Sequence, residues 1–272
     1  MQKTIRAKPT SRSAVNQSVQ LPKTPSFDLS GKSALVTGAG RGIGQAIAAA
    51  LAQAGATVTL VARTRTDIER TADAITRDGG KARILALDIT DLEKVAAAIR
   101  GSEPFDILVN NAGTNVPALF LEVQIADFDK TMALNVRSSF FVAQAVAKKL
   151  VEAKRPGSII NVSSQMGHVG GVKRTVYCAS KHAMEGLTKA MALDLAPFGI
   201  RVNTLCPTFV ETPMTRPFLA DDSFRQSVLS QIKLGRIGQV EDLMGGIVFL
   251  ASDASSLMTG TSLVIDGGWT AE

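Results

Sequence analysis

Short, uninterrupted hydrophobic runs alternate with longer stretches of helical character along most of this chain. Such runs, bounded by glycine or polar residues, are typical of strands buried on both faces of a parallel sheet. We expect seven strands, at Ser33–Thr37, Thr57–Ala62, Ala82–Leu87, Phe105–Asn110, Ser158–Val162, Ile200–Leu205 and Ser262–Ile265. The intervening pattern predicts helices at Gln45–Ala54, Asp67–Asp78, Asp91–Arg100, Ile125–Lys154, Tyr177–Ala196 and Val240–Ser252.

The regular alternation of strand and helix predicts an α/β fold. Successive βαβ units place their strands in one parallel sheet and their helices on both faces of it. We therefore expect a Rossmann-type, doubly wound, seven-stranded parallel sheet that forms a single domain over residues 28–272. Only residues 207–233 break the pattern. This stretch is rich in Pro, Thr and Asp, and we expect an irregular loop that covers a functional site.

Residues 1–27 differ from the rest of the chain in charge. They contain five basic residues and no acidic one, so removing them lowers the formal net charge from +6 to +1. The remainder therefore offers no basic face for nucleic acid, and a single Trp and a single Tyr leave few rings on which bases could stack. We expect a disordered basic tail. A mitochondrial transit peptide is the alternative, because the segment lacks the apolar stretch of a secretory signal.

The two cysteines, Cys178 and Cys206, and the two histidines do not show the spacing of a zinc site. We expect free thiols, no metal and a cytoplasmic location. No apolar run is long enough to cross a membrane, so we expect no membrane partner.

A glycine-rich turn follows the first expected strand and opens directly into a helix. It reads Thr37-Gly38-Ala39-Gly40-Arg41-Gly42-Ile43-Gly44. Glycines at such a turn let the backbone approach a pyrophosphate, whose charge is favoured by the helix N-terminus. The turn therefore predicts a dinucleotide site.

At this point the sequence resembles the short-chain dehydrogenase/reductase family, over roughly residues 28–269. The spacing Gly38-x3-Gly42-x-Gly44 matches the loop of that family. Further matching motifs are Asp88, Asn110-Asn111-Ala112-Gly113, Asn135, Ser164, Tyr177-x3-Lys181, Pro207 through Thr212 and Asp266-Gly267-Gly268. The resemblance implies an oxidoreductase that interconverts a ketone and a secondary alcohol, and a homotetramer assembled through the helices at Ile125–Lys154 and Tyr177–Ala196.

The end of the second expected strand predicts the choice of cofactor. It reads Val61-Ala62-Arg63-Thr64, without the carboxylate that would bind the ribose 2′-hydroxyl of NAD. Arg63 and Arg41 instead suit the 2′-phosphate of NADP(H). Alternatively, Arg63 is only a solvated surface charge.

The predicted chemistry centres on Tyr177 and Lys181, which are four residues apart and therefore share a helical face. An ammonium beside a phenol favours phenolate, so we expect a lowered pKa for Tyr177. The resemblance implies that Tyr177 is the general acid/base and that Lys181 also holds the nicotinamide ribose. It also implies that Ser164 binds the substrate oxygen, with Ser163 as the alternative, and that Asn135 bends its helix and holds a water of a proton relay.

The resemblance assigns further residues to the cofactor. Asp88 and Ile89 would lie at the adenine, and Asn110, Ala112 and Gly113 along the adenosine. Pro207, Val210 and Thr212 would contact the nicotinamide, together with Gly38, Arg41, Gly42, Ile43, Gly44, Arg63 and Thr64 around the phosphates and ribose. Asp88 could instead be an acidic residue of a helix N-cap region, and Asn110 could connect neighbouring strands by hydrogen bonds. Thr208 replaces the usual glycine of the family, so the resemblance does not define the conformation of the local turn.

His168 and Arg174 are the polar candidates for contact with the substrate. Both could hold a sugar acid or polyol, and both could equally point to solvent. A 3-oxoacyl thioester is the other candidate substrate. A dinucleotide-sensing protein without catalysis is the alternative function on the same fold. The complete set of Asn135, Ser164, Tyr177 and Lys181 disfavours it.

Overall fold

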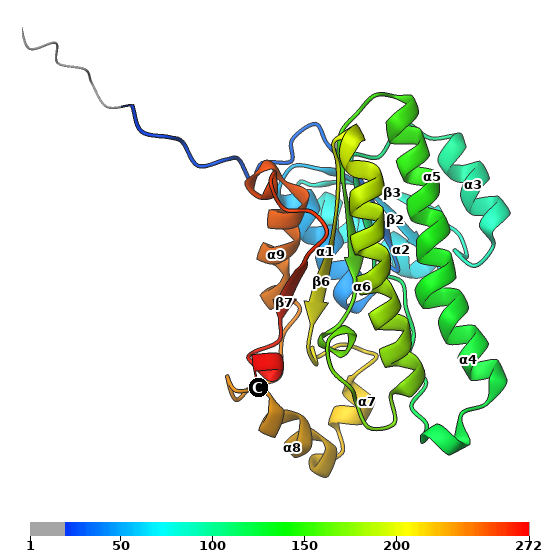
Figure 1. Cartoon of the computed structure of the whole chain (residues 1–272). Helices are drawn as coiled ribbons and strands as arrows, with labels where there is room; N and C mark the ends of the chain where they lie inside the picture. The colour runs from blue at the N-terminus through cyan, green and yellow to red at the C-terminus, as the bar shows by residue number, and fades with distance from the viewer. Residues whose placement is uncertain (1–19, 272) are drawn as a thin grey trace, which may run out of the picture.

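The computed structural model describes residues 20–271 and has one central sheet with helices on both faces (Figure 1). The sheet is parallel, with the strand order β3-β2-β1-β4-β5-β6-β7. Its strands are β1 (Ser33–Thr37), β2 (Thr57–Ala62), β3 (Lys81–Ala86), β4 (Ile107–Asn110), β5 (Gly157–Val162), β6 (Ile200–Pro207) and β7 (Ser262–Ile265). The order reverses between β1 and β4, which confirms the predicted doubly wound Rossmann-type sheet.

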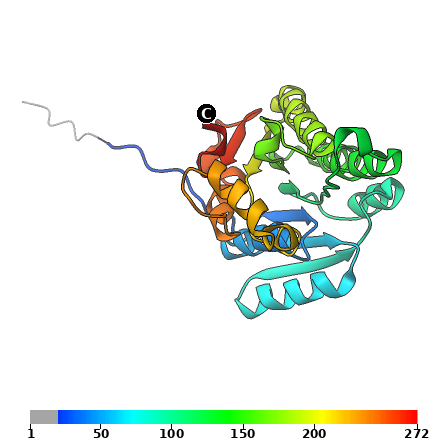
Figure 2. The ribbon, with the colours of Figure 1, turned by 90° about the horizontal axis from the view of Figure 1, so that it is seen from below.

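The helices form two layers. One face of the sheet is covered by α1 (Gly42–Gln53), α2 (Arg65–Arg77) and α9 (Glu241–Ala251). The other face is covered by α3 (Leu92–Arg100), α5 (Ser139–Glu152) and α6 (Thr175–Leu195). In Figure 2, the green and yellow-green helices lie on one side of the sheet, and the blue α1 and orange α9 lie on the other.

Strand β4 shows why the hydrophobic runs are uninterrupted. Ile107 and Val109 pack into the layer of α1 and α9, whereas Leu108, between them, packs into the layer of α3 and α5. Successive side chains of a strand point to opposite faces, and here both faces are covered. Burying each of these side chains contributes roughly 1.5–3 kcal/mol.

The long helix predicted over Ile125–Lys154 is interrupted. The structure has α4 (Ile125–Met132), a π-helical segment η2 (Ala133–Ser138) and then α5. The segment contains neither proline nor glycine, so neither residue type causes the interruption. Asn135 lies within it and is buried.

The stretch predicted to be irregular, residues 207–233, is only partly so. β6 continues to Pro207, and two short helices follow, α7 (Arg216–Leu219) and α8 (Asp222–Gln231). The Asp221 carboxylate caps α8 by accepting a hydrogen bond from the Phe224 amide at 2.9 Å. In Figure 1, both helices lie beyond the arrowhead of β6.

The predicted tail lies mostly outside the described residues. Residues 20–27, the described part of it, are exposed and form neither helix nor strand. Among residues 20–271, no helix is long and apolar enough to span a membrane.

Candidate active site

A cavity of about 350 Å³ lies beyond the carboxyl ends of the strands, where the strand order reverses. Crevices at this position bind ligands in open α/β sheets. The glycine loop, the segments after β2, β4, β5 and β6, and the first turn of α6 line the cavity. Met214, Thr215 and Phe218, in or near α7, also line it, so this short helix lies over the site.

The glycine loop fits a close approach of its backbone to a ligand. Gly38 and Gly42 have φ values of +67° and +57°, which favour glycine. A Cβ on Gly44 would lie 2.3 Å from the Gly38 carbonyl oxygen and from Asn111 Nδ2. Asn111 Nδ2 donates hydrogen bonds to the Thr37 and Gly38 oxygens at 2.9 and 3.2 Å. Asn111 therefore holds the loop, while α1 begins at Gly42 with its N-terminus toward the cavity.

The residues predicted to select NADP(H) line the same cavity. Arg41, Arg63 and Thr64 are among them. The Arg63 side chain is exposed, and its Nη1 lies 3.9 Å from Asp88 Oδ2. The other nearby carboxylate, Asp67, is paired with Arg70.

Asp88 and Ile89 also line the cavity, at the end of the segment after β3. The Asp88 carboxylate accepts hydrogen bonds from the Thr90 amide and hydroxyl at 2.9 and 2.8 Å. Partial burial raises the pKa of Asp88, but these hydrogen bonds and Arg63 outweigh it and hold the pKa below its usual range. The N-cap of α3 is Asp91, so Asp88 is not needed for that role.

Asn110 does not line the cavity, contrary to its predicted contact with the cofactor. Its side chain is buried, and Nδ2 donates to the Ser139 carbonyl at 3.1 Å and to Asn161 Oδ1 at 3.0 Å. Asn110 thus ties β4 to β5 and α5, which was the alternative interpretation. The neighbouring Ala112 and Gly113 do line the cavity.

Asn135 connects three parts of the site. Its Nδ2 donates to the Thr114 carbonyl at 2.9 Å and to Ser180 Oγ at 3.0 Å, and its Oδ1 accepts from the Thr114 amide at 2.8 Å. Ser180 in turn donates to the Tyr177 carbonyl at 2.7 Å. The π-helical segment therefore fixes the loop after β4 against α6. π-helical turns occur frequently at functional sites.

Tyr177, Lys181 and Ser164 all line the cavity. Lys181 Nζ lies 5.5 Å from the centre of the Tyr177 ring and donates to the Val162 carbonyl at 2.8 Å. Ser164 acts on the pKa of Tyr177, and its hydroxyl donates to Gln165 Oε1 at 2.7 Å. Ser163 also lines the cavity, and its buried hydroxyl has no hydrogen-bond partner among the described residues. The effect on Tyr177 favours Ser164 as the hydroxyl beside the phenol, with Ser163 still the alternative.

The prediction of a lowered pKa for Tyr177 is wrong, because its pKa is raised. Burial raises the pKa of Tyr177 to about 12, although the hydrogen bond with Ser164 acts against it. Burial also lowers the pKa of Lys181 to about 8. Desolvation disfavours both charged forms, and here it outweighs the attraction between ammonium and phenolate.

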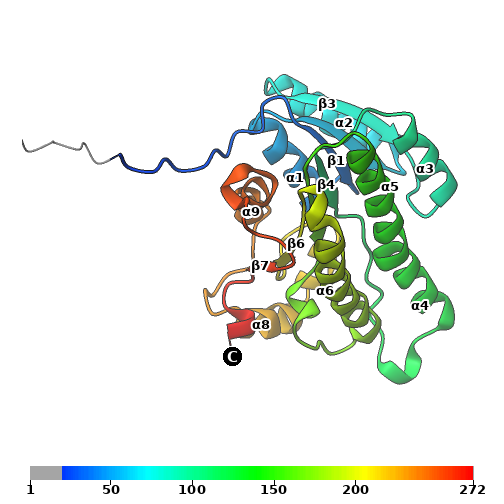
Figure 3. The ribbon, with the colours of Figure 1, turned by 45° about the horizontal axis from the view of Figure 1, so that its top comes forward.

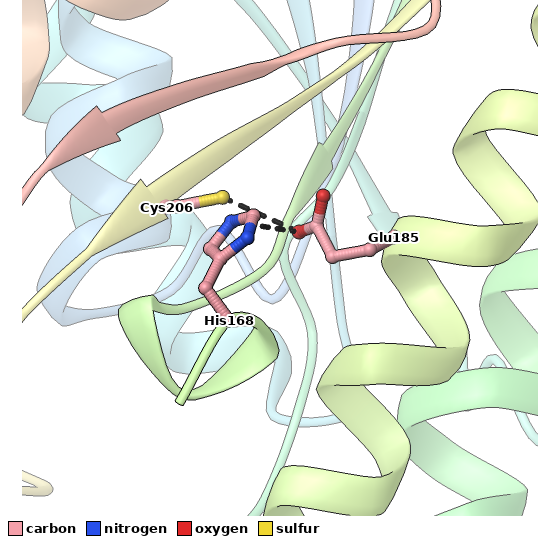
Figure 4. A group of neighbouring side chains, drawn as sticks. All are labelled: His168, Glu185 and Cys206. Atoms are coloured by element: carbon pink, nitrogen blue, oxygen red, sulfur yellow. Dashed lines mark hydrogen bonds and ion pairs between the residues drawn. The ribbon is translucent and has the colours of Figure 1, made fainter. Parts of the chain in front are cut away.

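His168, one of the two polar candidates for contact with the substrate, does not line the cavity. Its Nε2 lies 3.8 Å from Glu185 Oε1, which also accepts from the Cys206 thiol at 3.3 Å (Figure 4). The sequence did not predict that Cys206 would lie beside a histidine, and the three possible metal ligands lie within 4.8 Å of one another. The Glu185 carboxylate, however, already accepts hydrogen bonds from Cys206, Thr204 and Ser262. We interpret the group as the support of the loop between Ser164 and α6.

The segment after β6 faces the glycine loop. Pro207, Val210 and Thr212, the residues predicted to contact the nicotinamide, line the cavity, and so does Thr208. The φ of Thr208 is not positive, so no glycine is needed there. Its amide donates to the Ile265 carbonyl at 3.3 Å, while its buried hydroxyl has no partner among the described residues.

A Rossmann-type sheet with a glycine loop beside a Ser–Tyr–Lys group defines the class of nucleotide-dependent oxidoreductases. A family model described as "Enoyl-(Acyl carrier protein) reductase" matches residues 38–270. The chain belongs to the short-chain dehydrogenase/reductase family.

Three relatives show how closely the family is matched. The chain is 42% identical to bovine (Bos taurus) L-xylulose reductase, over 89% of this chain and 98% of the relative. It is 40% identical to gluconate 5-dehydrogenase of Gluconobacter oxydans, over 90% of this chain and 96% of the relative. A crystal structure of gluconate 5-dehydrogenase from Burkholderia cenocepacia with NADP and tartrate superposes with a TM-score of 0.87, at 36% identity over 90% and 98%.

Proposed function

We propose that this protein is an NADP(H)-dependent oxidoreductase that interconverts the ketone and the secondary alcohol of a sugar or polyol substrate. The observation that carries the proposal is one cavity lined by the glycine loop, by Arg41 and Arg63, and by Ser164, Tyr177 and Lys181. The relatives support the substrate class, since L-xylulose reductase and gluconate 5-dehydrogenase are named for carbohydrate substrates.

The residues present fit the cofactor. The backbone of the glycine loop, which lines the cavity with positive φ at Gly38 and Gly42, and the start of α1 suit a pyrophosphate. Arg41 and Arg63 suit the 2′-phosphate, because Asp67 is paired with Arg70 and the contact of the exposed Arg63 with Asp88 is long, at 3.9 Å. The cofactor supplies or accepts the hydride when it is bound.

The side chains around the reacting carbonyl supply the proton that its reduction requires. With a pKa of about 12, Tyr177 holds its proton at neutral pH and can donate it to the developing alkoxide. Ser164 donates a hydrogen bond to the same oxygen. Lys181 is mostly charged below its pKa of about 8 and favours the phenolate that remains after the transfer. Asn135 holds Thr114 and Ser180 in position, and a water bound there would carry the proton onward.

The first experiment measures NADPH oxidation with L-xylulose, with the keto acid that gluconate 5-dehydrogenase would form, and with a 3-oxoacyl thioester. NADH and a Tyr177→Phe variant serve as controls. We expect turnover that prefers NADPH and falls roughly 10²- to 10⁴-fold in the variant, because general acid catalysis is lost. NADPH binding without turnover of any ketone would favour the dinucleotide-sensing alternative.

The homotetramer is part of the proposal. Phe140 and Phe141 on α5 and Leu193 on α6 are large apolar side chains that remain 40%, 39% and 78% exposed. Figures 1 and 3 show both helices on the outer side of the same layer. Exposed apolar groups on neighbouring helices are typical of a contact between subunits. Light scattering that gives the mass of a monomer would contradict this assembly.

A cytoplasmic location is also proposed. Within the described residues, Cys178 and Cys206 are free thiols, which suits a reducing compartment. The only partner that we propose besides further copies of the chain is a small-molecule carbonyl or alcohol. Fractionation of cells that express the protein tests the location.

A further inference from the structure

Arg174 occupies a place in the cavity that is unusual for a charged residue. It is the N-cap residue of α6, three residues before Tyr177, and it lines the cavity. The residue is only 7% exposed. Its guanidinium carbon lies 5.9 Å from the centre of the Phe218 ring, so α7 covers it. The charge is therefore enclosed between the catalytic helix and the covering helix.

The guanidinium has few hydrogen-bond partners within the protein. Within residues 20–271, its one hydrogen bond joins Nη1 to the Lys173 carbonyl at 3.2 Å, and no carboxylate pairs with it. A guanidinium has five N–H donors, and those of Arg174 that do not bond Lys173 remain available at the cavity. The half-buried Arg201 shows the usual solution, since it donates four hydrogen bonds, to three carbonyls and to Ser255. The unpaired donors of Arg174 indicate a ligand that supplies the acceptor.

We propose that Arg174 binds a carboxylate of the substrate, so that the substrate is a polyhydroxylated keto acid and not a neutral ketose. This inference rests on the proposed function. One guanidinium fork matches one carboxylate in a bidentate pair and neutralises its single charge. Because Arg174 and Tyr177 lie three residues apart and face one cavity, the carboxylate and the reacting carbonyl belong to the same small molecule.

Two further groups of the cavity support a hydroxylated substrate. Asn115 Oδ1 and Thr208 Oγ1 are both buried without a hydrogen-bond partner among the described residues, and both residues line the cavity. The amide oxygen accepts hydrogen bonds and the hydroxyl can donate as well, so each can pair with a substrate hydroxyl. A plain acyl chain would leave both unpaired, at a cost for each.

The test compares two ketones that differ only in one terminal group, a hexulosonic acid and the corresponding ketohexose. Both are assayed with NADPH on the wild type, Arg174→Met and Arg174→Lys. Arg225→Met is the matched control, because it removes an exposed arginine of α8 that does not line the cavity. We expect Arg174→Met to lower kcat/KM for the acid roughly 10- to 100-fold, mainly through KM, and to leave the ketohexose within a few-fold. Arg174→Lys should restore part of the loss.

The outcomes separate this inference from the proposed function. Equal losses on both ketones in Arg174→Met would show a merely structural role and overturn the carboxylate site. A wild type that prefers the ketohexose, a phosphorylated ketose or an acyl thioester would overturn it as well. Failure of the wild type to reduce any ketone, with NADPH still bound, would refute the proposed function itself. A thermal shift of the NADP-bound protein by the hydroxy acid, absent in Arg174→Met, gives a second readout.

Discussion

Replacing Lys181 by methionine should make the protein more stable while it removes the activity. The Lys181 side chain is 6% exposed and makes one hydrogen bond, to the Val162 carbonyl at 2.8 Å. Burial lowers its pKa from 10.5 to about 8. Converted at about 1.4 kcal/mol per pH unit, this lowering means that the charged amine costs about 3 kcal/mol of stability at neutral pH.

Methionine keeps the length of the side chain and removes the charge. The Val162 carbonyl loses its donor, which costs about 1 kcal/mol, so the expected net gain is about 2 kcal/mol. The sign depends on pH. Between about pH 8 and 10.5 the unfolded chain keeps the lysine proton and the folded chain releases it, so the stability of the wild type rises with pH over this window. The advantage of the variant is therefore complete below pH 8 and disappears as the pH approaches 10.5.

Urea unfolding of both proteins without cofactor, at one protein concentration and at a series of pH values, measures this difference. Trp269, the single tryptophan, reports the transition by fluorescence. Lys189→Met is the matched control, because Lys189 lies exposed on the same helix and should change stability by no more than about 0.5 kcal/mol. A Lys181→Met protein that is less stable than the wild type at pH 7, or a difference that does not vary with pH, would refute the reasoning.

Three further predictions concern the cofactor and the proton. Arg63→Asp should lower kcat/KM for NADPH roughly 10-fold or more and raise it for NADH, because a carboxylate repels the 2′-phosphate and accepts from the 2′-hydroxyl. Gly44→Ala should abolish measurable NADPH binding in a fluorescence titration, since its Cβ would lie 2.3 Å from the Gly38 oxygen. Reduction by the wild type should slow as the pH rises through about 8, where Lys181 loses its charge; a rate that stays flat to pH 10 would contradict that role.

The fold could be predicted because both faces of the sheet are covered. Alternate residues of β4 enter opposite helical layers, so Ile107, Leu108 and Val109 form an uninterrupted run that the sequence shows directly. The glycine loop and the spacing of Tyr177 and Lys181 could also be recognised, because each depends on neighbours along the chain. Local spacing thus predicted most of the cavity wall.

Features that depend on distant contacts could not be predicted in the same way. The π-helical segment around Asn135 contains no proline or glycine that would reveal it, and Asn135 hydrogen-bonds with Thr114 and Ser180, 21 and 45 residues away. The two adjacent asparagines at the end of β4, Asn110 and Asn111, are equivalent in the sequence. Only the paired strand β5, through Asn161, shows that Asn110 faces the interior and leaves Asn111 to the glycine loop.

The pair of His168 and Arg174 shows how this limit bears on function. Both are basic residues of one loop, six positions apart, and the sequence alone does not distinguish them as contacts of the substrate. The two residues differ in their neighbours. His168 lies beside Glu185 and Cys206, in the group that supports the loop, whereas Arg174 is buried at the cavity with no acid beside it. His168 has a partner within the fold, the Glu185 carboxylate. Arg174 lines the cavity without an acid beside it, and for this reason Arg174 points to the substrate and His168 does not.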